Sequence, residues 1–250
     1  MESFRAVEFG VETDIGHGAQ LKLRRAGHIL GAATVTLKWH DRTIAFSGDL
    51  GRYDDPILFD PEPIGHADYL LLESTYGNRL HQQGDASEVL AEIVERTTAR
   101  GGTVVIPSFA VGRAQLLTYY LWKLKKAGRL RAVPVYLDSP MAINASAILR
   151  HHFGDHRISP EDAREIGDMV NYVRDTEDSK ALTVDKMPKV IISASGMATG
   201  GRILHHLGLS GPGHTRRDPR RRYRRTADPR PQCAHPGRGG GDIHAVSPCR

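Results

Sequence analysis

Three short stretches of this chain place a side chain that can bind a metal or a proton directly after an apolar, strand-like run. His28 lies among small residues in AGHILGAA, Asp49 lies between glycines in FSGDLGR, and Glu73 follows the leucines of LLLESTYG. Sheet-based enzymes carry functional side chains on the loops at strand ends. Imidazole and carboxylate groups are also ligands that divalent metals accept. The sequence therefore makes His28 and Asp49 a candidate metal pair, with Glu73 in an equivalent strand-end position.

Each of these residues also has an ordinary structural explanation. A single His among the thirteen in the chain is usually a packed or exposed side chain. Asp49 could close an Asx-type turn, and Glu73 could cap a segment or pair with a local cation. The pairing of His28 with Asp49 on neighbouring strand ends is what favours a site.

A second group of strand-end turns could grip phosphate. Residues 193–202, SASGMATGGR, read as a strand, a glycine-rich turn and a helix start. Backbone amides at such a helix start favour a phosphate, and Arg202 could add a bidentate contact. Residues 107–113 and 138–141 are similar turns that offer a hydroxyl or a cation. A glycine turn alone can simply permit close packing, but together the three turns predict one rim of a phosphodiester groove.

The elements that position these residues change character along the chain. Residues 18–48 alternate apolar and polar side chains, which predicts antiparallel strands, and a buried strand is expected over residues 69–72. After Gly77, helices alternate with short apolar strands, which is typical of a mainly parallel sheet covered on both faces. We expect strands over 103–106, 133–137 and 190–194, and helices over about 85–101 and 112–127 and from 159. Asp85 with Glu88 predicts a capping box at the first helix. The fold class is therefore α/β.

Composition separates the last segment from the rest. The chain has a formal charge of +5, yet residues 211–250 alone hold ten Arg against three Asp, so residues 1–210 are slightly acidic. That segment also contains both cysteines, six Pro and six Gly, and it cannot form a core. It could be a disordered basic tail, an RNA-binding arm or a stretch translated in a shifted frame, and we favour the last. Because the body has no thiol, any metal there must use His and carboxylate ligands.

The ordered series AGHILGAA, SGDLGR, LLLESTYGNR, IPSFAVGRAQ, YLDSPMA and SASGMATGGRILHHL closely resembles β-CASP ribonucleases of the metallo-β-lactamase superfamily. The resemblance covers roughly residues 4–207 and is nearer to the branch of RNA 3′-end-processing endonucleases than to RNase J. It implies part of a metallo-β-lactamase αββα sandwich over residues 1–76. It also implies an inserted Rossmann-like β-CASP domain over 77–208, followed by the basic segment 209–250.

The same resemblance implies roles for particular residues. His28 would be a zinc ligand, Asp49 the carboxylate that bridges two zinc ions, and Glu73 the acidic group that supports a catalytic histidine. In the family, two zinc ions lower the pKa of a bridging water, which attacks the phosphorus. The RNA backbone would be bound by Arg113, Ser139, Ser195 and Arg202. The implied partner is RNA, without a membrane. The cytoplasm is the default location, because no apolar run approaches a membrane span of about 18 residues.

The sequence departs from the family pattern in its histidines. The HxHxDH ligand cluster expected before His28 has no counterpart, since His17 stands alone, and His214, His235 and His244 lack the later family motifs. A catalytic zinc normally has at least three protein ligands. We therefore expect this chain alone to bind zinc weakly and not to hydrolyse RNA. A non-catalytic RNA-binding module and another hydrolase of the metallo-β-lactamase fold remain as alternatives. RNA specificity, endonuclease or exonuclease mode, and oligomeric state, a homodimer included, stay open.

Overall fold

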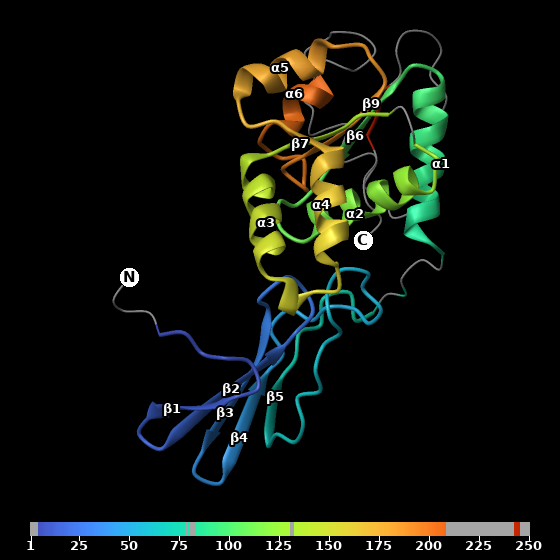
Figure 1. Cartoon of the computed structure of the whole chain (residues 1–250). Helices are drawn as coiled ribbons and strands as arrows, with labels where there is room; N and C mark the ends of the chain where they lie inside the picture. Colours follow the sequence, from blue (N-terminus) through green and yellow to red (C-terminus); the bar gives the residue numbers. More distant parts are fainter. Residues whose placement is uncertain (1–4, 79, 81–83, 131–132, 209–242, 246–250) are drawn as a thin grey trace. The chain divides into compact units, whose positions relative to one another are not determined.

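The computed structural model describes residues 5–78, 80, 84–130, 133–208 and 243–245 (Figure 1). The chain divides into two compact units. The first contains Met1–Leu80 together with His152–Ser159, and the second contains His81–His151 and Pro160–Arg250. The division at residue 80 is close to the expected boundary after residue 76. No local sequence pattern indicates that the short segment 152–159 joins the first unit.

The first unit is built on one five-stranded sheet in the described part of the chain. Its strands follow chain order across the sheet: β1 (Glu12–Gly16), β2 (Ala19–Arg25), β3 (Ala33–Trp39), β4 (Arg42–Phe46) and β5 (Tyr69–Leu71). The pairs from β1 to β4 are antiparallel, whereas β5 runs parallel to β4. The expected antiparallel strands over residues 18–48 are therefore confirmed. In the β2–β3–β4 register, Leu37 lies opposite both Leu21 and Ile44.

The expected burial of residues 69–72 is wrong. Tyr69, Leu70, Leu71 and Leu72 are each at least half exposed, with values of 57%, 53%, 50% and 60%. An apolar run indicates that a strand should be covered, but it does not show which residues cover it. Among the residues that the structure describes, the first unit has no α-helix packed on this strand and one short 3₁₀ turn, η1 (Phe153–Asp155).

The second unit is built on a parallel sheet whose described strands lie in the order β10-β6-β9-β7-β8. These strands are β6 (Thr103–Pro107), β7 (Val135–Asp138), β8 (Val170–Tyr172), β9 (Lys189–Ser193) and β10 (Ile243–Ala245). The helices are α1 (Ala86–Ala99), α2 (Arg113–Lys126), α3 (Pro140–His151), α4 (Pro160–Met169), α5 (Thr176–Val184) and α6 (Ile203–Gly208). The expected strands and helices after Gly77 are confirmed, with ends that differ by a few residues.

Helices cover both faces of this parallel sheet, as expected from its fully apolar strands. On one face, Val104 and Ile106 of β6 pack in the larger core with residues of α1, α2 and α3. On the other face, Val105 packs in a second core that includes Leu182 of α5 and Ile203 of α6. Because alternate residues of one strand enter different cores, both faces of the sheet must be apolar. Figure 1 shows α5 and α6 away from α1 and α2 in this unit.

One local expectation, the capping box, needs correction. The Asp85 side chain does cap α1, by accepting a hydrogen bond from the Ser87 amide at 2.8 Å. The Glu88 side chain forms an ion pair with Arg129 at 2.8 Å, which takes the place of the expected reciprocal bond to Asp85. In the segment 209–250, residues 243–245 form β10 beside β6. The rest of that segment, with His214 and His235, lies outside the described residues. No helix within the described ranges is long and apolar enough to cross a membrane.

Candidate functional site

The ends of β2, β4 and β5 lie at one edge of the first unit's sheet. β3 is antiparallel to both β2 and β4, so β2 and β4 run in the same direction, and β5 is parallel to β4. The loops that follow these three strands carry His28, Asp49 and Glu73, respectively. The strand ends alone would leave β2 and β4 about 10 Å apart, because β3 lies between them. The loops therefore have to close this gap if the side chains are to act together.

The loops after β2 and β4 do close that gap through direct backbone contact. The Gly51 amide donates a hydrogen bond to the Ala26 carbonyl at 2.7 Å. A Cβ at Gly51 would lie 1.9 Å from the Gly27 carbonyl oxygen and 2.7 Å from the His28 amide nitrogen. Only glycine fits at position 51, since real Cβ atoms do not approach backbone so closely. The glycines on either side of His28 and Asp49 thus bring two segments of backbone together.

Glu73 connects the third loop to the second. Its Oε1 accepts a hydrogen bond from the Leu50 amide at 2.5 Å, and its own amide donates to Ser47 Oγ at 2.9 Å. Ser47 is buried at the end of β4 and donates its amide to the Leu71 carbonyl at 2.9 Å. The carboxylate of Glu73 therefore holds the backbone of Leu50, the residue next to Asp49. This contact is also compatible with a purely structural role for Glu73, as a cap of a local segment.

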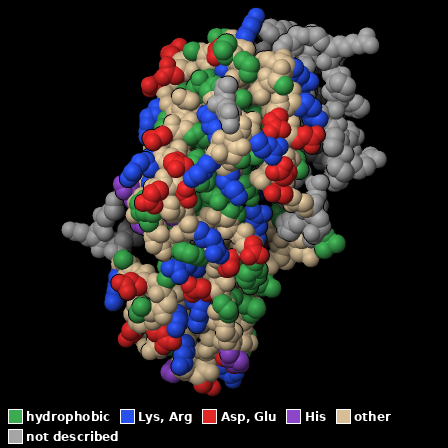
Figure 2. Space-filling model, turned by 45° about the vertical axis from the view of Figure 1, so that its right-hand side comes forward, with side chains coloured by type: hydrophobic (Ala, Val, Ile, Leu, Met, Phe, Trp, Pro, Cys, Tyr) green, Lys and Arg blue, Asp and Glu red, His purple; other side chains and the backbone are tan. Residues whose placement is uncertain are grey.

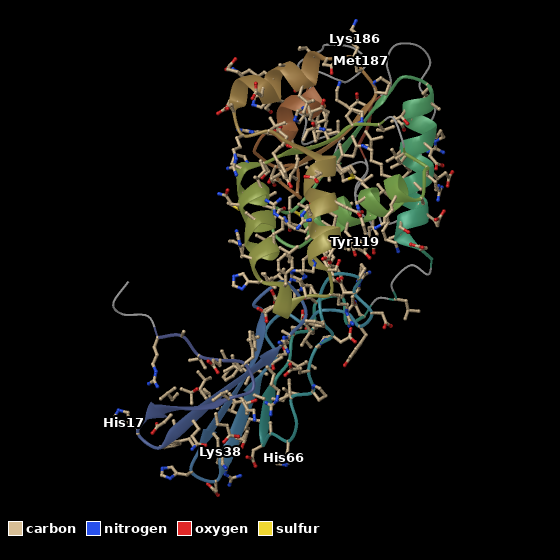
Figure 3. The ribbon with its side chains drawn as sticks, viewed as in Figure 1. His17, Lys38, His66, Tyr119, Lys186 and Met187 are labelled. Carbon is tan, nitrogen blue, oxygen red and sulfur yellow. The ribbon has the colours of Figure 1, made fainter. Side chains whose placement is uncertain are left out.

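The donors on these loops do not by themselves fit a closed zinc site. His28 and Asp49 are both exposed, and among the described residues no three His, Cys, Asp or Glu side chains gather closely enough to hold a metal ion. His17 cannot supply a third ligand, because it precedes β2 whereas His28 follows it, and a seven-residue strand is about 23 Å long. Figure 3 shows His17 and His66 towards the same end of the sheet as Lys38 in β3.

In the second unit, the expected phosphate-binding turns also meet at one sheet edge. They follow β6, β9 and β7, which are neighbours in the parallel sheet. The Ser108 amide donates to the Ser193 carbonyl at 3.0 Å, which joins the first two turns. Gln115 joins the first turn to the start of α3, directly after the third turn, because its Nε2 donates to the carbonyls of Ala110 and Ala142 at 3.2 and 3.1 Å. The three turns are therefore linked to one another by hydrogen bonds.

Asp138, at the end of β7, is the centre of a buried polar network. Its side chain is fully buried and accepts hydrogen bonds from Ser179 Oγ at 2.6 Å, Arg202 Nη1 at 2.7 Å and His206 Nε2 at 2.7 Å. Burial by itself would raise the pKa of Asp138, but the bonds from His206, Ser179 and Arg202 lower that pKa below its ordinary value of 3.8. The carboxylate is thus ionised and ties β7 to α5, α6 and the glycine-rich turn.

Arg202 faces this network. Besides Asp138, its guanidinium donates to the carbonyls of Val173 at 3.1 Å and Arg174 at 2.5 Å. Its side chain is 18% exposed. These contacts engage both terminal nitrogens of the guanidinium that the sequence assigned to RNA phosphate, so Arg202 positions the turn in this structure. Its contact with RNA stays a prediction.

The other residues expected to bind RNA phosphate lie on the connected turns. Ser139 is buried and caps α3, since its Oγ accepts from the Ala142 amide at 3.2 Å. Ser195 is half-buried in the glycine-rich turn, and Arg113 is the first residue of α2. Their roles towards RNA stay predictions.

Sequence reasoning missed Asp138, His206 and Phe109 as features of this edge. Asp138 carries the same signal as Asp49 and Glu73, a carboxylate directly after an apolar strand. His206 gives no local signal, because its partner lies 68 residues away in sequence. Phe109 was named only as part of a turn, yet its side chain is 52% exposed.

The surface charge fits the nearly neutral composition of residues 1–210. On the face seen in Figure 2, Lys and Arg side chains are intermixed with Asp and Glu side chains and form no continuous basic stripe.

Comparison with known proteins agrees with the motifs. A Beta-Casp domain matches residues 114–211. The chain is 39% identical over 219 residues to ribonuclease TTHA0252 of Thermus thermophilus, covering 83% of this chain and 50% of that protein. It is 30% identical to an RNase J-like protein of Methanocaldococcus jannaschii, covering 84% of this chain and 50% of that protein. It is also 33% identical to transcription termination factor FttA of the same organism, over 80% of this chain and 33% of the relative.

The chain thus spans about half the length of the first two relatives. Apart from residues 152–159, which belong to the first unit, the domain match lies in the second unit, and the aligned relatives extend the similarity over most of the chain. Together with the α/β architecture and the ordered motifs, these matches identify the chain as a member of the β-CASP family of metallo-β-lactamase-fold proteins.

Proposed function

We propose that this protein hydrolyses RNA phosphodiester bonds with the help of divalent metal, zinc being the expected ion. His28 and Asp49 would be ligands, and Glu73 would fix the loop that carries Asp49. The observation that supports this proposal most strongly is the direct backbone contact between the loops of His28 and Asp49, at the strand-end edge that also carries Glu73. Two of the relatives are named as an RNase J-like protein and a ribonuclease.

Unit 2 would contribute the grip on the substrate. Its three connected turns offer backbone amides, the hydroxyl of half-buried Ser195 and the side chain of Arg113. Such groups bind the phosphate backbone and give affinity without reading sequence. Orientation of the RNA by these turns is the part of the function that this chain's own residues would supply directly.

The 250-residue chain itself should bind zinc weakly and leave RNA intact. Two ligands are fewer than a catalytic zinc needs, and a two-metal centre needs more. When bound, the metal would activate water and stabilise charge on the phosphate oxygens. The donors present among the described residues do not complete such a site.

Zinc titration and RNA cleavage test this proposal together. The purified chain should take up less than one tightly bound zinc and should not cleave a labelled single-stranded RNA, and Asp49→Ala should weaken the remaining zinc binding. Stoichiometric tight zinc with nuclease activity that Asp49→Ala abolishes would refute the expected inactivity. Zinc binding that neither Asp49→Ala nor His28→Ala changes would refute the metal site.

A non-catalytic RNA-binding module is the second candidate. The connection of the three turns through Gln115 and Ser108 favours it, because this surface is complete within unit 2. It predicts RNA binding that falls steeply with salt and is unaffected by chelators. Binding that needs zinc would argue against it.

A further inference from the structure

We propose that Phe109 is a stacking platform for an unpaired nucleobase of single-stranded RNA, placed among the turns that grip the phosphates. This inference rests on the proposed RNA function and adds the kind of RNA that the surface selects. It starts from an unusual exposure. Phe109 is 52% exposed although it follows β6, in which every residue is buried.

The ring is held in place on one side. Its Cδ2 and Cε2 atoms lie 2.8 and 3.0 Å from the position that a Cβ on Gly196 would occupy, so the ring rests against the bare backbone of the glycine-rich turn. The backbone of Phe109 is also fixed, since its carbonyl accepts from Ser108 Oγ at 3.0 Å and from the Ala114 amide at 3.2 Å. An aromatic ring that is packed on one face and exposed to solvent on the other loses little conformational entropy when a base stacks on it.

Two further apolar side chains at these strand ends are also exposed. Met197 follows Gly196 in the glycine-rich turn and is 42% exposed, and Met141, the second residue of α3, is 67% exposed. Exposed apolar side chains that gather on ligand-binding turns mark an interaction surface. Methionine sulfur and aromatic rings both make favourable contacts with flat aromatic groups.

The charge of the turns favours a nucleotide over a neutral apolar partner. Residues 107–113, 138–141 and 193–202 carry two arginines and one carboxylate, and that carboxylate, Asp138, is buried against Arg202 and His206. The formal charge of these turns is therefore positive by one, which favours an anionic partner. A flat apolar ring beside an anion-binding turn is the pairing that single-stranded nucleic acids require, because each nucleotide offers a base and a phosphate.

Duplex RNA does not fit this surface, because its bases are already stacked on each other and the ring can reach only an unstacked base. The inference thus assigns single-stranded segments, loops or ends as the substrate class. It does not depend on base identity, since every base presents a stacking face.

Fluorescence anisotropy of the full chain with a labelled oligoadenylate, in the presence of a chelator, tests the platform without any hydrolysis. Phe109→Leu keeps an apolar side chain but removes the ring, and it should weaken binding by at least about fivefold, within the roughly 5- to 150-fold that loss of one stacked ring costs. Phe109→Trp should restore the affinity, and its fluorescence should be quenched when RNA binds. Phe153→Leu, which alters a Phe that is 40% exposed in the first unit, should leave binding unchanged.

An abasic oligomer with the same sugar-phosphate backbone completes the design. It should bind wild type and Phe109→Leu equally, because it has no base to stack. Equal oligoadenylate affinity for wild type and Phe109→Leu would overturn the platform and point to a protein partner for the exposed ring. So would an equal loss of abasic binding, or failure of the wild type to bind RNA. The protein could bind RNA as predicted in the presence of chelator and still fail to cleave RNA when the missing metal ligands are supplied. That result would refute only the proposed hydrolysis and would leave the stacking platform standing.

Discussion

The sharpest test of the second unit's architecture is Asp138→Asn. This substitution keeps the shape of the side chain and replaces one carboxylate oxygen with an amide NH₂. The carboxylate accepts three hydrogen bonds, from Ser179, Arg202 and His206. An amide at this position turns a donor towards at least one of those donors and removes the charge that Arg202 faces.

The expected loss follows from burial. Removing one member of a buried ion pair costs about 3–5 kcal/mol, because the other charge is left without compensation. Arg202 is partly relieved by the carbonyls of Val173 and Arg174, which still accept its N–H groups. We therefore expect Asp138→Asn to reduce the free energy of unfolding of the second unit by about 3 kcal/mol. That is a large share of the roughly 5–15 kcal/mol that stabilises a typical domain.

Urea unfolding followed by Trp122 fluorescence measures this change in a Trp39→Phe background. Trp122 is a buried residue of α2 that donates a hydrogen bond to Glu165 of α4, so its fluorescence reports on the second unit alone. Asp162→Asn is the matched control, because Asp162 forms an ion pair with Lys126 in which both side chains are solvent-accessible. Solvent screens this ion pair, so its loss should reduce the free energy of unfolding much less. A loss below about 1 kcal/mol for Asp138→Asn would refute the network as a stabilising hub.

The pH dependence gives this prediction a second signature. The pKa of Asp138 is lowered in the folded chain, so its contribution to stability is present above its ordinary value of 3.8 and is lost as the pH falls through the folded pKa. The difference between wild type and Asp138→Asn should therefore shrink as the pH falls below about 4. A difference that grows on acidification would contradict the assignment.

Three further changes test the loops. Gly51→Ala should separate the loops of His28 and Asp49, because its Cβ would lie 1.9 Å from a carbonyl oxygen. In urea unfolding it should destabilise the first unit by about 1–3 kcal/mol. Gly154→Ala, which has open space at its Cβ, should change the stability little. Glu73→Ala should speed hydrogen exchange at the Leu50 amide, whereas Glu73→Gln, which keeps an acceptor, should not; equal exchange in both variants would contradict the contact. Gly196→Ala should displace the Phe109 ring and weaken oligoadenylate binding in the anisotropy assay as much as Phe109→Leu does, and unchanged affinity would speak against the packing.

The sequence predicted local structure well where one pattern decides it. The alternation over residues 18–48 and the helix after Asp85 depend on neighbours within a few positions, and both are present. The exposure of residues 69–72 could not be predicted, because an apolar run does not show whether other residues of the chain pack against it. Segment 152–159 joins the first unit through contacts such as Arg157 with Asp60 at 2.8 Å, which no local pattern announces.

The candidate site was predictable in part for the same reason. Glycines flanking His28 and Asp49 indicated close backbone approach, and Gly51 makes such an approach to the loop of His28. Arg202 shows what a local motif does not predict. Its place after a glycine-rich turn indicated phosphate, yet the carboxylate it meets is 64 residues earlier in sequence. A pairing over that separation is set by the fold and is invisible to a motif.

Nuclear magnetic resonance of the histidine side chains, with Co²⁺ as a paramagnetic substitute for zinc, tests the central assignment most directly. If His28 and Asp49 share a metal, low concentrations of Co²⁺ should broaden the ring signals of His28 before those of His17 and His66, and Asp49→Asn should abolish this selectivity. Uniform broadening of the three histidines, or selective broadening of His28 that survives Asp49→Asn, would contradict a site formed by these two loops.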